Sequence, residues 1–250
     1  MQRYFIEFSY DGSCYHGWQI QPNGRTVQAV LQECLSILLR SDIELVGAGR
    51  TDAGVHARRM FAHFDLEVGE RECCGMMSCS DLSYKLNRML PCDISVSRIF
   101  PVASNLHARF SARKRTYHYY LHTKKDPFRR HYSWETHYAL DFEKMNEAAA
   151  YLVNVDDFAS FCKTGADVKT TLCHVTTACW VYEGGDCWHF EISADRFLRN
   201  MVRAVVGTLI EVGRGRMSVS DFQSVVAQKC RTAAGESMPA HALFLVDVEY

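Results

Sequence analysis

The stretch GAGRTDAGVHA at residues 47–57 holds the side chains best suited to chemistry. Arg50 and Asp52 stand two residues apart between Gly49 and Gly54. Such a turn projects the Asp52 carboxylate clear of a sheet, and the glycines let another molecule approach closely. Arg50 favours the ionised carboxylate, which is then an acid–base group or a nucleophile. The alternative is that Asp52 only forms a turn with its own backbone, and the local sequence leaves both interpretations open.

Other chemistries match the sequence less well. A phosphate-binding loop needs the Walker pattern, which is absent, and Asp52 would repel an anion there. The serine hydrolase and metalloprotease motifs are also missing, and a metal-dependent nucleic-acid hydrolase would need clustered carboxylates. Cys73, Cys74 and Cys79 include an adjacent pair with poor chelating geometry and no histidine nearby in sequence. We therefore expect no metal site at these cysteines.

An aromatic strand is predicted at 115–123, in the sequence RTYHYYLHT. Alternation puts Tyr117 and Tyr119 on one face, and His118 and Tyr120 on the other. Core packing explains aromatic residues on one face but not on both. Because basic residues directly precede them, base stacking by these rings is a second interpretation.

A basic helix is predicted at 196–212, beginning RFLRNMVR. Helical spacing would set Arg196, Arg199 and Arg203 near one another on one face. A solvated charged face is the plain explanation for any one basic cluster. Three such residues on one helix face indicate an anionic partner.

The elements that must position these residues follow from hydrophobic periodicity and capping residues. Helices are expected after Thr26, after Ser80, after Asp141 and after Ser218, in addition to 196–212. Further strands are expected at 3–10, 43–49, 60–68, 94–100 and 242–250, with a hairpin at 176–194 that turns on Gly184 and Gly185. This order predicts an α+β fold of two ferredoxin-like halves, residues 1–105 and 106–250, with helices against antiparallel sheets and a substrate cleft between the halves.

Composition sets broader limits. The chain has 250 residues, 48% of them hydrophobic, so it can bury a sizeable core. Its eleven cysteines include no C-x-x-C pair, and we expect reduced, mostly buried thiols. The net charge of -1 neither requires nor excludes a nucleic-acid partner. No signal peptide or membrane span is evident, so we expect a soluble, cytoplasmic protein.

Seven stretches resemble the TruA-type tRNA pseudouridine synthases. They occur in the order of that family, at its approximate spacing, and span nearly the whole chain. The stretch GRTDAGVHA is highly specific by itself. The seven stretches are YDGSCYHGWQIQ, TVQAVLQ, GAGRTDAGVHA, HARFSARKRTYHYYL, DFASF, RFLRNMVRAVVGTLIEVG and ALFLVDVEY.

The resemblance implies an isomerase that detaches uracil from ribose, rotates it and rejoins it through carbon, without a metal or cofactor. Asp52 matches the catalytic nucleophile, which attacks either the uracil ring or the anomeric carbon. Arg50 matches the side chain that enters the RNA stack and displaces the target nucleotide. Tyr117 matches the ring that stacks on the flipped uracil. Arg203 matches the cation that keeps Asp52 charged, and Leu245 the apolar wall of the pocket.

The family's substrate, fold and assembly are implied in the same way. The substrate is the anticodon arm of tRNA, at positions 38, 39 or 40. Two α+β halves join their sheets around a basic cleft, and the enzyme is a homodimer. A catalytically silent tRNA-binding module is the alternative, but it would be expected to lack Asp52, Tyr117 or Arg203, and all three are present.

The chain departs from the family pattern at three positions. Cys173 stands where the family usually has arginine, so a positive charge is lost. Ala242 and Phe244 replace the usual glycine and tyrosine near the C-terminus, which removes a hydroxyl and keeps the pocket apolar. These changes bear on RNA contacts more than on the chemistry.

Overall fold

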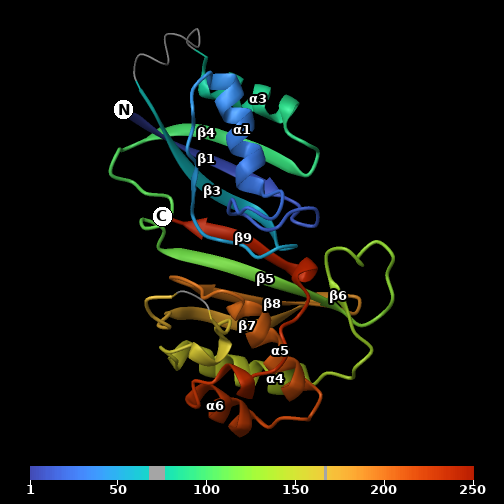
Figure 1. Ribbon diagram of the computed structural model, residues 1–250. Helices are drawn as coiled ribbons and strands as arrows, with labels where there is room; N and C mark the ends of the chain where they lie inside the picture. The colour runs from blue at the N-terminus through green and yellow to red at the C-terminus, as the bar shows by residue number, and fades with distance from the viewer. Residues whose placement is uncertain (68–76, 166–167) are drawn as a thin grey trace. The chain divides into compact units, whose positions relative to one another are not determined.

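A computed structural model describes residues 1–67, 77–165 and 168–250. The chain forms two compact units, shown in Figure 1: an N-terminal unit of Met1–Arg113 with Leu245–Tyr250, and a C-terminal unit of Lys114–Phe244. The predicted C-terminal half began at residue 106 and ran to residue 250. In the structure, residues 106–113 and 245–250 belong to the N-terminal unit instead. Because the chain returns to its first unit at Leu245, the end of the sequence contributes to the same unit as the Asp52 stretch.

The sheet of the N-terminal unit is antiparallel around its first strand. Strand β1 (Gln2–Tyr10) pairs with β3 (His56–Leu66) on one side and β4 (Ile94–Val102) on the other. The two-residue β2 (Val46–Gly47) pairs with β3, and β9 (Leu243–Glu249) is the next strand after β3. Helices α1 (Val27–Leu39) and α3 (Cys79–Met89) pack beside one another against this sheet (Figure 1).

The strand predicted at 43–49 is mostly wrong. The backbone of Ile43 and Leu45 bonds to side chains of α1: Ile43 N–H donates to Ser36 Oγ at 3.1 Å, and Leu45 N–H to Gln32 Oε1 at 3.1 Å. Gln28 Nε2 in turn donates to the Leu45 carbonyl at 2.7 Å. Because the helix satisfies these groups, only Val46–Gly47 joins the sheet.

In the N-terminal unit, one predicted helix cap is confirmed and one is corrected. Thr26 caps α1, accepting the Ala29 N–H as predicted. Helix α3 is capped by Ser78 instead of Ser80, because Asp81 stands three residues after Ser78 and completes a reciprocal capping box. Ser80 therefore lies inside the first turn.

The C-terminal unit has the same kind of layering. Strand β5 (Lys114–His122) pairs antiparallel with β8 (Cys187–Ala194), which pairs antiparallel with β7 (Val175–Gly184). The predicted hairpin between β7 and β8 is confirmed, and β6 (Trp134–Glu135) adds a short parallel pairing to β5. Helices α4 (Phe142–Tyr151), α5 (Met201–Gly213) and α6 (Val219–Ala227) pack together beside this sheet (Figure 1). Among the described residues of this unit, 3-10 turns form at Leu152–Asn154, Ala159–Phe161, Arg231–Ala233 and Ala240–Ala242.

The predicted start of the basic helix at Arg196 is wrong, because α5 begins at Met201. The Asp195 carboxylate accepts the Arg196 N–H at 2.7 Å, which holds the chain in a bend, and Asn200 then adopts the left-handed conformation with φ 66°. Asparagine tolerates that conformation but interrupts a helix. The expected helix face shared by Arg196, Arg199 and Arg203 is therefore absent, since only Arg203 lies on α5.

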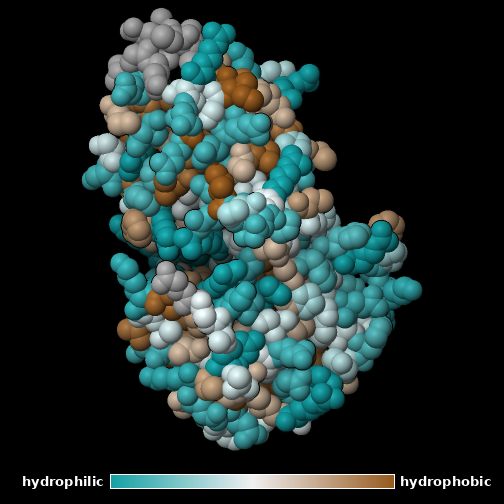
Figure 2. Space-filling view, viewed as in Figure 1, coloured by the Kyte–Doolittle hydropathy of each residue, from teal (hydrophilic) through white to brown (hydrophobic). Residues whose placement is uncertain are grey.

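Both units confirm the predicted α+β class, with mostly antiparallel strands flanked by helices. Within the part of the chain that the structure describes, no helix is long and apolar enough to cross a bilayer. The face drawn in Figure 2 is mainly hydrophilic, and hydrophobic residues appear as scattered single groups.

Candidate active site

Asp52 lies in the loop between β2 and β3. Its side chain is partly exposed, and the neighbouring Arg50 is exposed. The Asp52 carbonyl accepts the Val55 N–H at 3.1 Å, and the buried hydroxyls of Thr51 and Tyr10 are 2.8 Å apart. The turn is thus closed by its own backbone and held to the end of β1 on one side.

A second segment, residues 11–18, holds this loop through its backbone. Trp18 N–H donates to the Thr51 carbonyl and Gly54 N–H to the Tyr15 carbonyl, both at 3.3 Å. Gly17 has φ +85°, and a Cβ there would lie 2.4 Å from the Thr51 oxygen. Glycine is needed here both for the positive φ and for the close approach.

Side chains anchor the 11–18 segment to the sheet. Tyr15 donates its hydroxyl to Asp93 at 2.6 Å, and burial together with that carboxylate raises the pKa of Tyr15. The Trp18 ring lies 5.3 Å from the Phe8 ring and closely covers Gly47.

A histidine next to the loop also contacts this segment. The buried His56 accepts the Gly12 N–H at Nδ1, at 3.1 Å. Backbone atoms on either side of Asp52 are therefore fixed from several directions.

Tyr117 lies on β5 in the C-terminal unit and is 8% exposed. Its ring meets the Phe197 ring edge-on, with centroids 5.0 Å apart and an interplanar angle of 82°. Tyr119 on the same face is fully buried, and burial raises the pKa of its hydroxyl while the Arg203 charge opposes the rise. Tyr117 thus has one ring edge fixed by packing.

Arg203 lies in the first turn of α5. Its Nε donates to the carbonyl of Met238, and its own carbonyl accepts the Met238 N–H at 3.1 Å. One turn later, Gly207 lets the backbone at Glu236 approach, since a Cβ at Gly207 would lie 1.8 Å from the Glu236 oxygen. These contacts hold the segment before β9 along α5, and the hydrogen bond to Met238 orients the Arg203 guanidinium.

Leu245 and the three residues that depart from the family pattern are buried. Leu245 on β9 is 2% exposed and Ala242 is fully buried. Phe244 meets the Tyr120 ring edge-on at 5.3 Å, so phenylalanine packs here without a hydroxyl. Cys173 is 4% exposed, and burial raises the pKa of its thiol to about 12, so the position is uncharged at neutral pH.

The five predicted site residues divide between the two units. Arg50, Asp52 and Leu245 belong to the N-terminal unit, and Tyr117 and Arg203 to the C-terminal unit. Their convergence on one substrate stays a prediction. Cys73 and Cys74 lie outside the described residues, and Cys79 begins α3.

Sequence reasoning missed the residues that position Asp52. Gly17, Trp18 and Tyr10 carry no chemistry of their own, and YDGSCYHGWQ contributes to the resemblance without revealing its role. The available signal was a glycine next to a tryptophan directly after a strand and turn, which is typical of a close backbone approach.

Comparisons with known proteins agree on one family. A family model described as tRNA pseudouridine synthase matches residues 7–111 and 148–250. A protein of Bacteroides fragilis named tRNA pseudouridine synthase A is 54% identical over 250 residues, covering 100% of this chain and 97% of that protein. A protein of the same name from Bacillus subtilis is 38% identical over 246 residues, covering 97% of this chain and 96% of its own.

Proposed function

The chain belongs to the tRNA pseudouridine synthase family, and on that basis we propose that it isomerises uridine to pseudouridine in the anticodon arm of tRNA. The reaction breaks the bond between uracil N1 and ribose C1′ and forms one between C5 and C1′. The C5 proton is lost and N1 gains a proton, so atoms and electrons balance without a redox partner. No cofactor is needed for that balance.

Asp52 is the proposed nucleophile. What carries the proposal is the loop geometry: the backbone on both sides of Asp52 is hydrogen bonded to the 11–18 segment, while the carboxylate itself stays partly exposed. A nucleophile held in place before substrate binds avoids an entropic cost at the transition state. The carboxylate attacks either the uracil ring or C1′.

The other four residues have proposed roles on the same uridine. Arg50 is exposed and enters the space left when the nucleotide leaves its stack, an extrusion that costs a few kcal/mol. Tyr117 stacks on the uracil, and Leu245 supplies an apolar wall. Arg203 is the proposed cationic partner of the Asp52 carboxylate.

The targets are expected to be uridines 38, 39 and 40, reached by base flipping. A homodimer and a cytoplasmic location belong to the same proposal and rest on family membership alone. Light scattering of the purified protein tests the dimer, and chemical mapping of pseudouridine in tRNA from cells lacking the protein tests the positions.

Substitution of Asp52 tests the chemistry. We expect Asp52→Asn and Asp52→Ala to lower the release of tritium from tRNA labelled at uracil C5 by at least about 10³-fold, because the nucleophile is lost. Binding of tRNA, followed by gel shift, should survive. The exposed Asp42 provides the matched control, and Asp42→Asn should keep full activity.

Two results would count against the proposal. Full turnover by the Asp52 variants would remove Asp52 from the mechanism. A wild-type protein that binds tRNA and releases no tritium would instead favour the catalytically silent binding module.

A further inference from the structure

We propose that His118, His189 and Glu191 bind a divalent metal ion of the zinc class. His118 lies on β5, and the other two lie on β8, the strand next to it. One possible ligand atom from each residue lies within 4.8 Å of the others. Two imidazoles and one carboxylate form a ligand set that zinc uses in proteins, with a fourth position for water.

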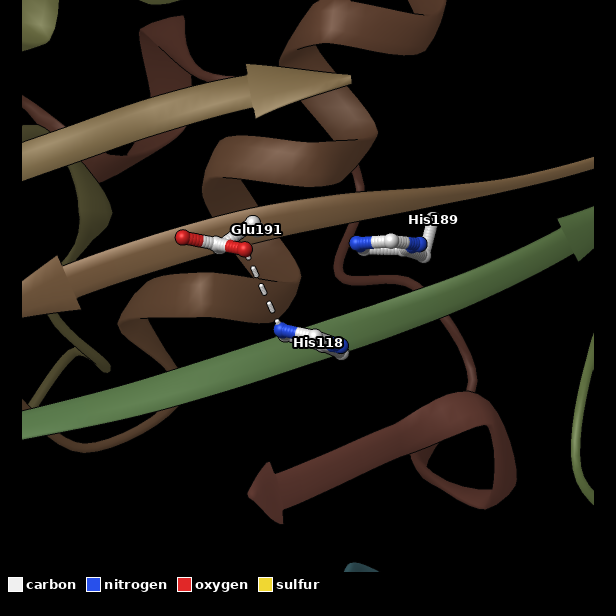
Figure 3. A group of neighbouring side chains, drawn as sticks. All are labelled: His118, His189 and Glu191. Atoms are coloured by element: carbon white, nitrogen blue, oxygen red, sulfur yellow. Dashed lines mark ion pairs between the residues drawn. The ribbon is translucent and has the colours of Figure 1, made fainter. Parts of the chain in front are cut away.

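The strand register places the three side chains on one face. His118 is directly opposite Glu191 in the antiparallel pair, and His189 is two residues from Glu191 along β8. Residues two apart on a strand point to the same face. Figure 3 shows a nitrogen of each imidazole ring on the side of the Glu191 carboxylate.

Hydrogen bonds to the outer ring nitrogens prepare both histidines. His189 Nδ1 lies 3.0 Å from Glu183 Oε1, and since a carboxylate only accepts, Nδ1 is the donor. A neutral His189 then has its lone pair on Nε2. A carboxylate behind a histidine in this way is the usual partner of a metal-binding imidazole.

His118 is arranged in a similar way. Its Nδ1 lies 3.3 Å from the Tyr120 hydroxyl, and its Nε2 lies 3.4 Å from Glu191 Oε2. If the neutral ring of His118 carries its proton on Nδ1, the lone pair of Nε2 faces a lone pair of the Glu191 carboxylate. Either a second proton or a metal ion relieves their repulsion.

Closing the site needs only side-chain rotation. Bonds of about 2.1 Å in a tetrahedral site put ligand atoms about 3.4 Å apart. The His118–Glu191 contact already has that length, whereas the two rings are stacked with centroids 4.3 Å apart at 15°. His189 must therefore tilt its Nε2 toward the ion. The side chains of His118 and Glu191 are 19% and 33% exposed, so both can also adjust toward the ion, whereas the 11% exposed His189 must turn about its contact with Glu183.

The ion would link β5 to β8 next to Tyr117, and it would stay outside the proposed reaction. Tyr117 and His118 are consecutive on β5, so they point to opposite faces of the strand. A bound ion is expected to stabilise the C-terminal unit and to leave the carboxylate chemistry of Asp52 unchanged. This inference is independent of the proposed function.

The test uses the full-length protein after chelator treatment, titrated with Zn²⁺ by calorimetry and with Co²⁺ by visible absorption. We expect one ion per chain, a rise in Tm with Zn²⁺, and a Co²⁺ spectrum of nitrogen and oxygen ligands. His189→Ala and Glu191→Gln should each weaken binding at least about 10-fold, and Glu183→Gln about 10- to 100-fold, because it removes the group behind His189.

His137 provides the matched control, because its side chain is 79% exposed and its 3.3 Å contact with Glu135 lies outside the proposed group of three. His137→Ala should leave the affinity unchanged. Circular dichroism checks that each variant is folded. The proposal is overturned if wild-type and His189→Ala proteins bind with equal affinity, or if the Co²⁺ spectrum shows thiolate charge-transfer bands, which would assign the ion to cysteines.

Discussion

The two units hold their candidate site residues in different ways. In the N-terminal unit, Asp52 lies on an irregular loop fixed by backbone hydrogen bonds to the 11–18 segment and by the close approach of Gly17. In the C-terminal unit, Tyr117 and Arg203 project from a strand and a helix. Side-chain contacts with Phe197 and with the Met238 backbone orient them.

This difference decides where each arrangement is vulnerable. A loop held by main-chain contacts tolerates changes of side chain but not an added Cβ at the point of approach. A residue on regular structure keeps its backbone position when its neighbours change, and only its own side-chain contacts matter. The two units should therefore respond to opposite kinds of substitution.

The largest effect is expected from Gly17→Ala. The new Cβ would meet the Thr51 carbonyl at 2.4 Å at a residue with φ +85°, so the loop that carries Asp52 must shift. Because displacement of a reacting group by about 1 Å can cost about 100-fold in rate, we expect tritium release to fall by at least that factor. Steady-state kinetics on labelled tRNA measure the loss.

Gly215 separates the displacement from plain backbone strain. It has φ +69°, and a Cβ there would meet nothing within 4 Å. Gly215→Ala should lower the free energy of unfolding by about 1 kcal/mol and leave the activity unchanged. Equal activity losses in the two variants would show that the Gly17 contact does not position Asp52.

A smaller effect is expected from Arg203→Lys. Lysine keeps the positive charge but loses the planar group that donates to the Met238 carbonyl. We expect tritium release to fall about 10- to 100-fold, while the free energy of unfolding falls by about 1 kcal/mol, since the Met238 N–H bond to the Arg203 carbonyl remains.

Arg214, at the C-terminal end of the same helix, provides the control. Its Nη1 pairs with Glu211 at 2.8 Å, and its guanidinium covers the Tyr138 ring. Arg214→Lys should lose similar stability and keep full activity. If both variants lose activity alike, the guanidinium of Arg203 has no special place in the site.

Prediction from sequence succeeded where one element supplies its own signal. Alternation and a turn with two glycines located the β7–β8 hairpin, and Thr26 marked the start of α1. Contacts between distant segments carry no such signal, so the helix side chains that bond to residues 43–45 went unseen. The left-handed Asn200 also breaks a helix whose pattern of apolar residues continues through it.

Among the substitutions considered, one at His63 is expected to have the smallest effect near neutral pH. Under acid conditions, its effect on stability is expected in the N-terminal unit, which contains His63. His63 is 4% exposed on β3, and its Nδ1 accepts the Ala108 N–H at 3.1 Å. Burial lowers the pKa of His63 to about 4, helped by the charge of Arg3. The folded state therefore needs a neutral imidazole.

The sign of the pH dependence follows from that depressed pKa. An unfolded chain binds a proton at this histidine below about pH 6.5, whereas the folded chain resists until about pH 4. The free energy of unfolding should therefore fall as the pH drops through this window, by up to about 3 kcal/mol. His63→Gln keeps an acceptor without titrating, so urea unfolding should show a flatter pH profile, whereas the exposed His137→Gln should match wild type. Hydrogen exchange should detect earlier opening at Ala108 in acid, and equal pH slopes in all three proteins would show that His63 does not control this response.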